Sequence, residues 1–521
     1  MAKIERTKNA TRNIIFGIIL KVYQIFMPFM LRTAMIYFMG VQYLGLSSLF
    51  SSVLQVLNLA ELGVGSAMVY SMYKPIAEDE STKICALMKL YKIYYRIIGL
   101  VIGTVGVGLL PFIPKLIKGD VPADINIYIL YLLNLMTTVF SYWLFAYKNS
   151  ILTAHQRTDI VSKVSLVTNS IQFILQFFVV WLLKNYYIYI IIALMVQVIT
   201  NVFTAIVADK LYPNYKPEGK LQKQEVNAIN KRIRDLFTAK LGGVIVNSVD
   251  TIVISAFLGL NILAVYQNYF YIITSVLGFV SVIFSACTAG IGNSLILESK
   301  QKNYNDLKKF TFIVAWIAGF CSCCFLNLFQ PFMEIWVGKE LMLQYNAVIC
   351  MVIYYFIYEI NQLLNLYKDA GGIWHEDRFR PLVTALSNLG MNLIMVRIWG
   401  IYGVLLSTVF SMLFVGMPWL FYNLFTTIFE RELLLDYLKK LFKLSMVSFG
   451  VCVASVGLCN IINIGLFQTI IIRLCMCLIV PNVMFCIIYY RTVEYRESLF
   501  LMNTITKGKF IKILRKLGMN R

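Results

Sequence analysis

The chain contains about fourteen apolar segments, each long enough to cross a lipid bilayer. A helix needs about 20 predominantly apolar residues to span a hydrocarbon core of about 30 Å. Because a lipid-facing backbone must satisfy its own hydrogen bonds, we expect these segments to be helices and the chain to be an all-α, polytopic membrane protein. The segments lie at 13–39, 44–72, 93–114, 126–147, 164–183, 186–208, 236–258, 262–297, 310–331, 345–367, 382–398, 401–424, 444–464 and 467–490.

Positive charge falls in alternate gaps between these segments. Of the 47 Lys and Arg residues, only Lys115, Lys118, Lys184 and Lys339 lie in the other set of gaps. Cytoplasmic loops are enriched in Lys and Arg, so this asymmetry predicts that both termini are cytoplasmic. We expect a multi-pass protein of the bacterial cytoplasmic (inner) membrane.

Composition supports a membrane environment and excludes some partners. Hydrophobic residues make up 59% of the chain and charged residues 14%, with a net charge of +21. The basic residues are dispersed among short loops rather than gathered on one domain, which favours contact with anionic lipid headgroups over nucleic-acid binding. Membrane lipids are therefore expected partners, and nucleic acid is not.

An internal repeat organises the segments. Phe38, Gly40, Val41 and Leu44 recur at one constant offset as Phe257, Gly259, Leu260 and Leu263, and the same offset relates Lys21 to Lys240 and Asn169 to Asn388. Six spans per repeat is an even number, so both lobes enter the membrane in the same orientation, with a pseudo-two-fold axis along its normal and a cleft between them. The predicted domains are a six-helix lobe at 1–208, a cytoplasmic connector at 209–235, a second six-helix lobe at 236–424, two extra transmembrane helices at 425–490 and a basic cytoplasmic tail at 491–521.

The gaps between spans are uneven. The predicted external gaps are minimal at 41–43, 184–185, 259–261 and 400. The longest hydrophilic segment, at 209–235, is cytoplasmic and ends in charged residues at helical spacing. We expect it to lie on the membrane surface between the two lobes.

Three cationic residues in the spans are candidate binding residues. A charge near the bilayer centre costs at least about 2.5–3.5 kcal/mol, so each needs an aqueous cavity, a partner or a function. Lys21 and Arg32 share one face of the first helix, and Lys240 occupies the corresponding place in the second half. Such a cleft suits an anion, and the planar fork of arginine suits phosphate oxygens. The alternative is that the long side chains extend to the lipid headgroups.

Acidic residues in the spans suggest two further roles. Asp250 is the candidate for coupling transport to an H⁺ or Na⁺ gradient, because buried carboxylates commonly carry these ions. Glu61 precedes Gly63 and Gly65, which permit close helix approach, and a structural ion pair is the role we expect for it.

The sequence contains no recognisable catalytic or cofactor site. It has no Gly-rich phosphate loop of the G-x-x-x-x-G-K-[ST] type and no nucleophile–base constellation. Its two histidines are too few for a metal site, and nearly all of its cysteines lie inside apolar segments. We therefore expect a transporter that is not an enzyme and needs no metal or cofactor.

Several stretches of sequence resemble a known family. LAELGVGSAMVYSMYKPIAE at 59–78 is the most specific, and VDTIVISAFLGL at 249–260, MEIWVGKE at 333–340 and GIYGVLLSTVFS at 400–411 are similar in pattern. The first twelve spans resemble polysaccharide flippases of the Wzx type, in the superfamily that also holds lipid II flippases and multidrug and toxin extruders.

The resemblance implies a function and one residue role. It implies that oligosaccharide linked to undecaprenyl pyrophosphate moves between leaflets by alternating access, for O-antigen, capsule or exopolysaccharide, with a polysaccharide polymerase and glycosyltransferases as partners. In related flippases an arginine late in the first helix lines a cationic cavity, and Arg32 matches that placement.

Two other functions are kept as alternatives. A multidrug extruder generally carries lipophilic cations, for which acidic rather than basic stripes are expected. An integral-membrane polysaccharide polymerase generally needs a sizeable external loop with catalytic bases, and no predicted external gap is substantial.

Overall fold

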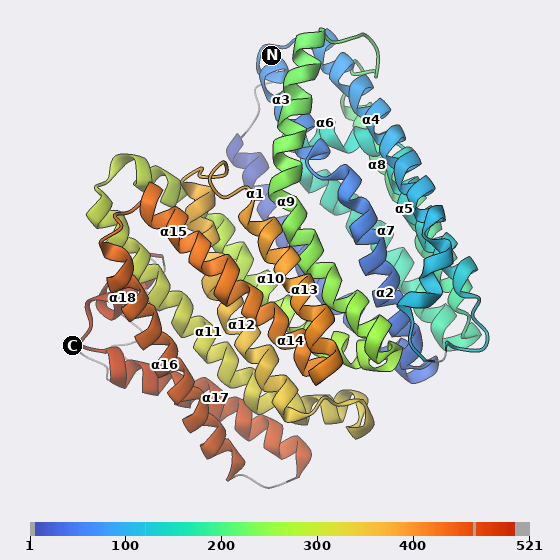
Figure 1. Cartoon of the computed structure of the whole chain (residues 1–521). Helices are drawn as coiled ribbons and strands as arrows, with labels where there is room; N and C mark the ends of the chain where they lie inside the picture. The colour runs from blue at the N-terminus through green and yellow to red at the C-terminus, as the bar shows by residue number, and fades with distance from the viewer. Residues whose placement is uncertain (1–5, 120, 462–464, 506–521) are drawn as a thin grey trace. The chain divides into compact units, whose positions relative to one another are not determined.

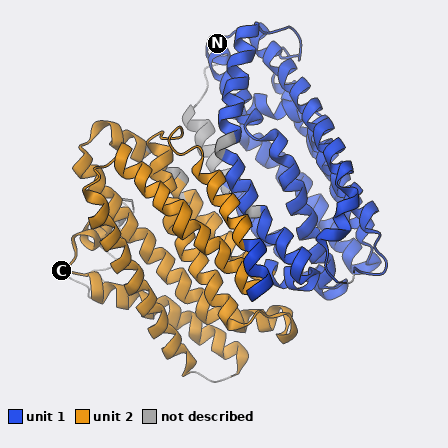
Figure 2. Ribbon diagram, in the orientation of Figure 1, with its two compact units in different colours: residues 1–267, 392–400 blue, residues 268–391, 401–521 orange. Residues whose placement is uncertain are grey.

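Helices make up nearly all of the regular structure (Figure 1). The structure is a computed structural model that describes residues 6–119, 121–461 and 465–505, and no β-strand occurs in these ranges. The chain forms two compact units (Figure 2). The first comprises Met1–Gln267 and Asn392–Gly400, and the second comprises Asn268–Met391 and Ile401–Arg521.

The predicted membrane-spanning helices are present. Among the described residues, 13 helices are long and apolar enough to cross a membrane, or 14 if α5 and the helical turns that follow it, bent by 47°, form one span. The prediction of an all-α polytopic protein is therefore confirmed. The helices are α1 (Arg6–Phe38), α2 (Val41–Leu57), α3 (Val64–Ala77), α4 (Ser81–Gly108), α5 (Ile127–Trp143), α6 (Asn149–Ala154), α7 (Thr158–Phe178), α8 (Tyr186–Leu211), α9 (Lys223–Leu258), α10 (Leu260–Leu297), α11 (Lys300–Val337), α12 (Tyr345–Ala370), α13 (Arg380–Trp399), α14 (Ile401–Phe410), α15 (Met417–Thr427), α16 (Leu433–Asn460), α17 (Leu466–Tyr489) and α18 (Val493–Ile505).

Tight turns occur at or directly beside the four gaps predicted to be minimal, although residues 41–43 form the first turn of α2 and residues 260–261 begin α10. Gly40 and Gly259, which the repeat relates, adopt nearly the same backbone conformation, with φ 115° and ψ 160° at Gly40 and φ 98° and ψ 171° at Gly259. Glycine tolerates this positive φ because it lacks a Cβ atom. Lys184 and Gly400 also have positive φ, at 49° and 56°. The shared geometry of Gly40 and Gly259 supports the internal repeat.

The loops that follow the fourth span of each repeat also match. Arg157 Nε donates to Asp159 Oδ1 at 2.9 Å in the first unit. Arg380 Nε donates to Asp377 Oδ1 at 2.6 Å in the second. Both carboxylates are almost fully buried. A buried carboxylate needs a charged, hydrogen-bonded partner, and each repeat supplies one from the same short loop.

The second span is not the continuous helix that its apolar sequence predicts. It divides into α2 and α3 at the 3₁₀ turn η1 (Asn58–Glu61). Gly63, with φ 87°, begins α3. A Cβ atom on Gly63 would lie 2.7 Å from Leu236 Cβ of α9, so the break permits close approach of α9. The break also places the Glu61 carboxylate inside the first unit.

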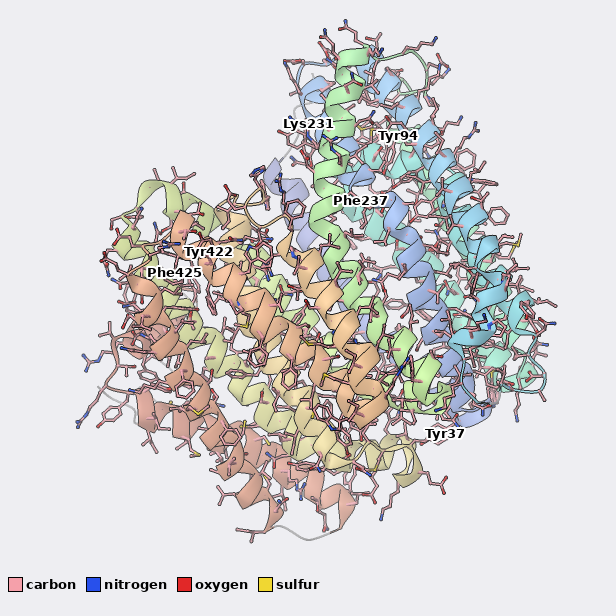
Figure 3. The ribbon with its side chains drawn as sticks, in the orientation of Figure 1. Tyr37, Tyr94, Lys231, Phe237, Tyr422 and Phe425 are labelled. Carbon is pink, nitrogen blue, oxygen red and sulfur yellow. The ribbon has the colours of Figure 1, made fainter. Side chains whose placement is uncertain are left out.

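The predicted cytoplasmic connector is only partly a separate segment. Residues 223–235 form the first turns of α9, which continues without interruption through the seventh span to Leu258. Glu225 pairs with Lys83 of α4 at 2.8 Å, and Tyr94 donates to Asn230 Oδ1 at 2.6 Å. Figure 3 labels Tyr94 on α4 and, on α9, Lys231, which follows Asn230 in the chain. These contacts pack the predicted connector helix against α4 of the first unit.

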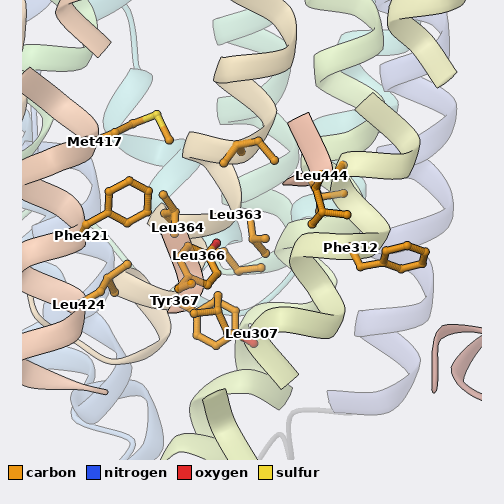
Figure 4. Close-up of a cluster of buried hydrophobic side chains, with 14 of the residues drawn as sticks. Leu307, Phe312, Leu363, Leu364, Leu366, Tyr367, Met417, Phe421, Leu424 and Leu444 are labelled. Atoms are coloured by element: carbon orange, nitrogen blue, oxygen red, sulfur yellow. The ribbon is translucent and has the colours of Figure 1, made fainter. Parts of the chain in front are cut away.

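The second unit is organised around α11, which packs against α12, α16, α17 and α18. Apolar side chains between these helices form one buried cluster, shown in part in Figure 4. The final spans α16 and α17 are therefore part of the second unit. The cluster includes Leu307, Phe312, Leu363, Leu364, Tyr367, Phe421, Leu424 and Leu444.

Close backbone packing in the first unit predicts a stability effect at Gly45 of α2. A Cβ atom there would lie 2.5 Å from the Leu260 carbonyl oxygen, which is backbone and cannot rotate away. Gly45→Ala should therefore destabilise the protein by about 1–3 kcal/mol, as overpacking does. The measurement is the melting temperature of the purified full chain in detergent.

Gly243→Ala is the matched control, because Gly243 is an exposed helical glycine and a Cβ atom there would meet no other atom within 4 Å. Helix propensity predicts that this variant is neutral or stabilised by up to about 1 kcal/mol. Equal melting temperatures for the two variants would contradict the packing described for Gly45.

Candidate functional site

Arg32 lies in the last third of α1 and is partly buried. Its guanidinium is close enough to Tyr189 of α8 for an electrostatic interaction. Tyr189 stacks on Tyr186 with ring centroids 5.5 Å apart. The structure thus places the arginine beside an aromatic pair of the first unit.

The two candidate lysines are more exposed than Arg32. Lys21 of α1 is exposed, as is Lys240 of α9, whose Nζ lies 3.3 Å from Ser66 Oγ of α3. Both belong to the first unit. The contacts of Arg32 and Lys240 lie on different helices, so these contacts do not join the three cations into one cluster. Their shared role in binding stays a prediction.

Asp250 of α9 is held by an amide. Asn392 Nδ2 donates to Asp250 Oδ1 at 2.7 Å, and Asn392 is fully buried. Asn392 comes from the last turns of α13, which belong to the first unit. A neutral donor of this kind stabilises the carboxylate without neutralising its charge. The ion-coupling role of Asp250 stays a prediction.

Glu61 lies at the break between α2 and α3. Its Oε1 accepts a hydrogen bond from Tyr95 at 3.1 Å, and Tyr91 donates to Tyr95 at 2.6 Å. The hydrogen-bonding partner of Glu61 is thus a tyrosine hydroxyl. No described basic side chain lies within 4.0 Å of the Glu61 carboxylate, but Lys240 of α9 is near enough to interact with it electrostatically. The structural ion pair stays a prediction.

A polar cavity of about 550 Å³ lies within the first unit. It is lined mainly by η1 and by helices α3 to α8, the blue to cyan part of Figure 1. A polar cavity among membrane spans is unfavourable unless its walls are hydrated or bind a ligand. Its polar lining comprises Glu61, Tyr91, Tyr95, Ser141, Tyr142, Asn149, Ser150, Thr153, Ser165, Asn169, Gln172, Gln197, Thr200, Asn201 and Thr204.

Three tyrosines form one wall of this cavity. The rings of Tyr91 and Tyr95 are 4.3 Å apart between centroids, and those of Tyr95 and Tyr142 are 5.4 Å apart, both edge to face. This geometry is favourable for aromatic pairs. The hydroxyl groups of Tyr91 and Tyr95 connect the wall to Glu61.

Amides and hydroxyls line the opposite wall. Gln197 Nε2 donates to Asn201 Oδ1 at 3.1 Å, and Asn201 Nδ2 donates to the Ser141 carbonyl at 3.0 Å. Asn169 and Gln172 contribute from α7. The sequence carries a signal for this wall, because polar residues recur every three or four positions in the fifth and sixth spans, at 165, 169 and 172 and at 197, 200, 201 and 204.

The charge of the lining limits what the cavity can bind. Glu61 is its only acidic residue, and none of the lining residues in the described part of the chain is Lys or Arg. No group of three or more His, Cys, Asp or Glu side chains suited to a metal ion occurs among the described residues. The cavity therefore suits a neutral or weakly cationic polar group rather than a phosphate or a divalent metal ion.

The residue that corresponds to Asn169 in the second repeat has a different environment. Asn169, which lines it, corresponds in sequence to Asn388 of α13. Asn388 is fully buried and its Nδ2 donates to Thr408 Oγ1 of α14 at 2.9 Å. In the second unit this amide thus makes a hydrogen bond between two helices. In the first unit the corresponding amide lines the cavity.

Comparisons with known proteins establish the fold. No family model and no curated protein matches the sequence. The structure is similar to the lipid II flippase MurJ in an inward-closed conformation, with a TM-score of 0.66 and 16% identity over 92% of this chain and 99% of that one. It is also similar to an inward-facing structure of a multidrug resistance MATE family transporter of the MOP superfamily, with a TM-score of 0.60 and 15% identity over 78% of this chain and 98% of that one. For an outward-facing structure of such a transporter, the TM-score is 0.51 and the identity is 15%, over 81% of this chain and 95% of that one. The chain has the fold of MOP-superfamily transporters.

Proposed function

We propose that this chain is a flippase of the Wzx type that moves oligosaccharide linked to undecaprenyl pyrophosphate across the bacterial cytoplasmic membrane. The observation that carries the proposal is Arg32, a partly buried cation in a membrane span of a chain that shares the fold of a lipid II flippase. The resemblance of residues 59–78 to polysaccharide flippases supports the same function.

In this mechanism the cations hold the charged part of the substrate. Arg32 binds the diphosphate through its planar fork, and Lys21 and Lys240 add positive charge while the lipid chain stays in the bilayer. The two lobes then alternate between inward and outward access, with both termini in the cytoplasm. Glycosyltransferases supply the substrate, and a polymerase uses it for O-antigen, capsule or exopolysaccharide.

The role of Arg32 is tested in a strain that lacks its own flippase. Arg32→Ala should lower surface polysaccharide by at least about tenfold, because a charge-assisted hydrogen bond contributes about 1.5–3 kcal/mol. Arg32→Lys should retain more activity, because it keeps the charge and loses the fork. The measurement is surface glycan per amount of flippase in the membrane.

Arg397→Ala is the matched control. Arg397 is exposed near the end of α13, where its guanidinium lies 5.6 Å from the centre of the Phe257 ring, so its loss should leave export unchanged. Full complementation by Arg32→Ala would contradict the proposal.

Asp250 is tested as the coupling group with Asp250→Asn. The new amide retains an oxygen that accepts the hydrogen bond from Asn392, so the local geometry is conserved. If Asp250 carries H⁺ or Na⁺, transport by the variant in vesicles should lose its dependence on the imposed gradient. Unchanged pH and sodium dependence would exclude this carboxylate as the carrier.

A multidrug extruder is the second candidate, favoured by the likeness to MATE structures and by the single acidic residue of the polar cavity. The two functions are separated in a bacterial strain without its own efflux pumps. The flippase proposal predicts that expression of the chain leaves resistance to lipophilic cations unchanged. A rise in resistance that Glu61→Gln removes would favour the extruder.

A further inference from the structure

Among the described residues, the polar cavity of the first unit is lined by no Lys or Arg side chain that could bind the diphosphate. We propose that it binds a sugar residue of the lipid-linked substrate. This inference rests on the proposed function and assigns the glycan to a place that no described Lys or Arg side chain lines. It therefore divides one amphipathic substrate between two parts of the same unit.

The chemistry of the lining matches a sugar. A sugar ring presents hydroxyl groups that both donate and accept hydrogen bonds, and the cavity offers amide side chains and hydroxyls that do the same. The aromatic wall of Tyr91, Tyr95 and Tyr142 offers ring surface to the C–H face of a sugar. Glu61 adds a carboxylate that accepts hydrogen bonds from hydroxyls.

Size and charge exclude the simpler occupants. At about 550 Å³ the cavity is far larger than a single ion requires, and it lies within the range of about 300–1,000 Å³ that is typical of small-molecule sites. A phosphate would meet a carboxylate and no Lys or Arg among the lining residues. In this proposal the charged diphosphate binds at the cations, and the glycan binds in the cavity.

Asn169 is the most informative residue of the site. Its carboxamide lines the cavity and has no hydrogen-bonding partner among the described residues. A carboxamide in a membrane span without a partner is unfavourable, so it calls for water or a ligand. Its repeat counterpart Asn388, in contrast, is bonded to Thr408.

Hydrogen bonds connect the cavity wall to the surroundings of Arg32. Gln172, which lines the cavity, donates from Nε2 to Gln176 Oε1 at 3.2 Å. Gln176 in turn donates to the Tyr189 carbonyl at 3.0 Å, and Tyr189 interacts electrostatically with Arg32. The chain of hydrogen bonds ends at the backbone carbonyl of Tyr189, and the side chain of the same residue interacts with Arg32, so the cavity and Arg32 both adjoin α8 of the first unit.

The test measures how much a sugar adds to lipid binding. The full chain is placed in nanodiscs, and dissociation constants are measured for undecaprenyl pyrophosphate and for the same lipid carrying one N-acetylglucosamine or one galactose. Two or three new hydrogen bonds predict that wild type binds a sugar-bearing lipid about tenfold more tightly. Asn169→Leu and Gln197→Leu should each reduce this preference and together abolish it, without changing the affinity for undecaprenyl pyrophosphate.

Ser170→Ala is the matched control, because Ser170 is next to Asn169 but lines an apolar groove between α1 and α7. It should keep the preference of the wild type. Arg32→Ala should weaken binding of all three lipids and leave the preference intact.

The outcomes separate the two proposals. Wild type that binds none of the lipids would contradict the proposed flippase function. The proposed sugar site alone would be overturned if the wild-type protein bound all three lipids equally well. It would also be overturned if the cavity variants kept the preference for the sugar-bearing lipids. Equal weakening of all three lipids by the cavity variants would also overturn it, because that result indicates a structural role.

Discussion

The free energy of placing polar groups inside a bilayer governs this structure. Each charge or amide among the spans requires a partner, water or a ligand. Most of them have a protein partner: Asp250 has Asn392, Asn388 has Thr408, and Lys148 has Asp209. Many side chains around the polar cavity are also hydrogen-bonded, but polar groups gather there at one place in the first unit, and Asn169 has no hydrogen-bonding partner among the described residues. The functional account follows from that contrast and from the cation at position 32.

Much of the fold is predictable from the sequence because hydropathy and glycine placement are local properties. The spans follow from long apolar runs, and the tight turns follow from gaps such as Gly40 and Gly259. The repeat found by a constant offset between these glycines agrees with their nearly equal backbone angles. The predicted Wzx-type function, the orientation in the membrane and the roles of Arg32, Lys21, Lys240 and Asp250 remain predictions.

Other features depend on contacts between distant segments, which a single sequence does not reveal. The break of the second span coincides with the close approach of Gly63 to Leu236 of α9. Helix α9 begins within the predicted connector at a local capping box of Gln222 and Glu225, but the packing of this start against α4 depends on distant contacts such as Glu225 with Lys83. The polar cavity draws its lining from six helices and two 3₁₀ turns, so the spacing at 165, 169 and 172 suggests a polar face without identifying what it meets.

The central claim is that the first unit holds the charged head and the glycan of one lipid in two neighbouring places. An experimental structure of the full chain in nanodiscs with undecaprenyl-pyrophosphoryl-N-acetylglucosamine tests it most directly. The account predicts diphosphate density at the Arg32 guanidinium and sugar density beside Asn169 and Gln197. An Arg32 side chain that faces lipid chains, with the headgroup bound elsewhere, would contradict it.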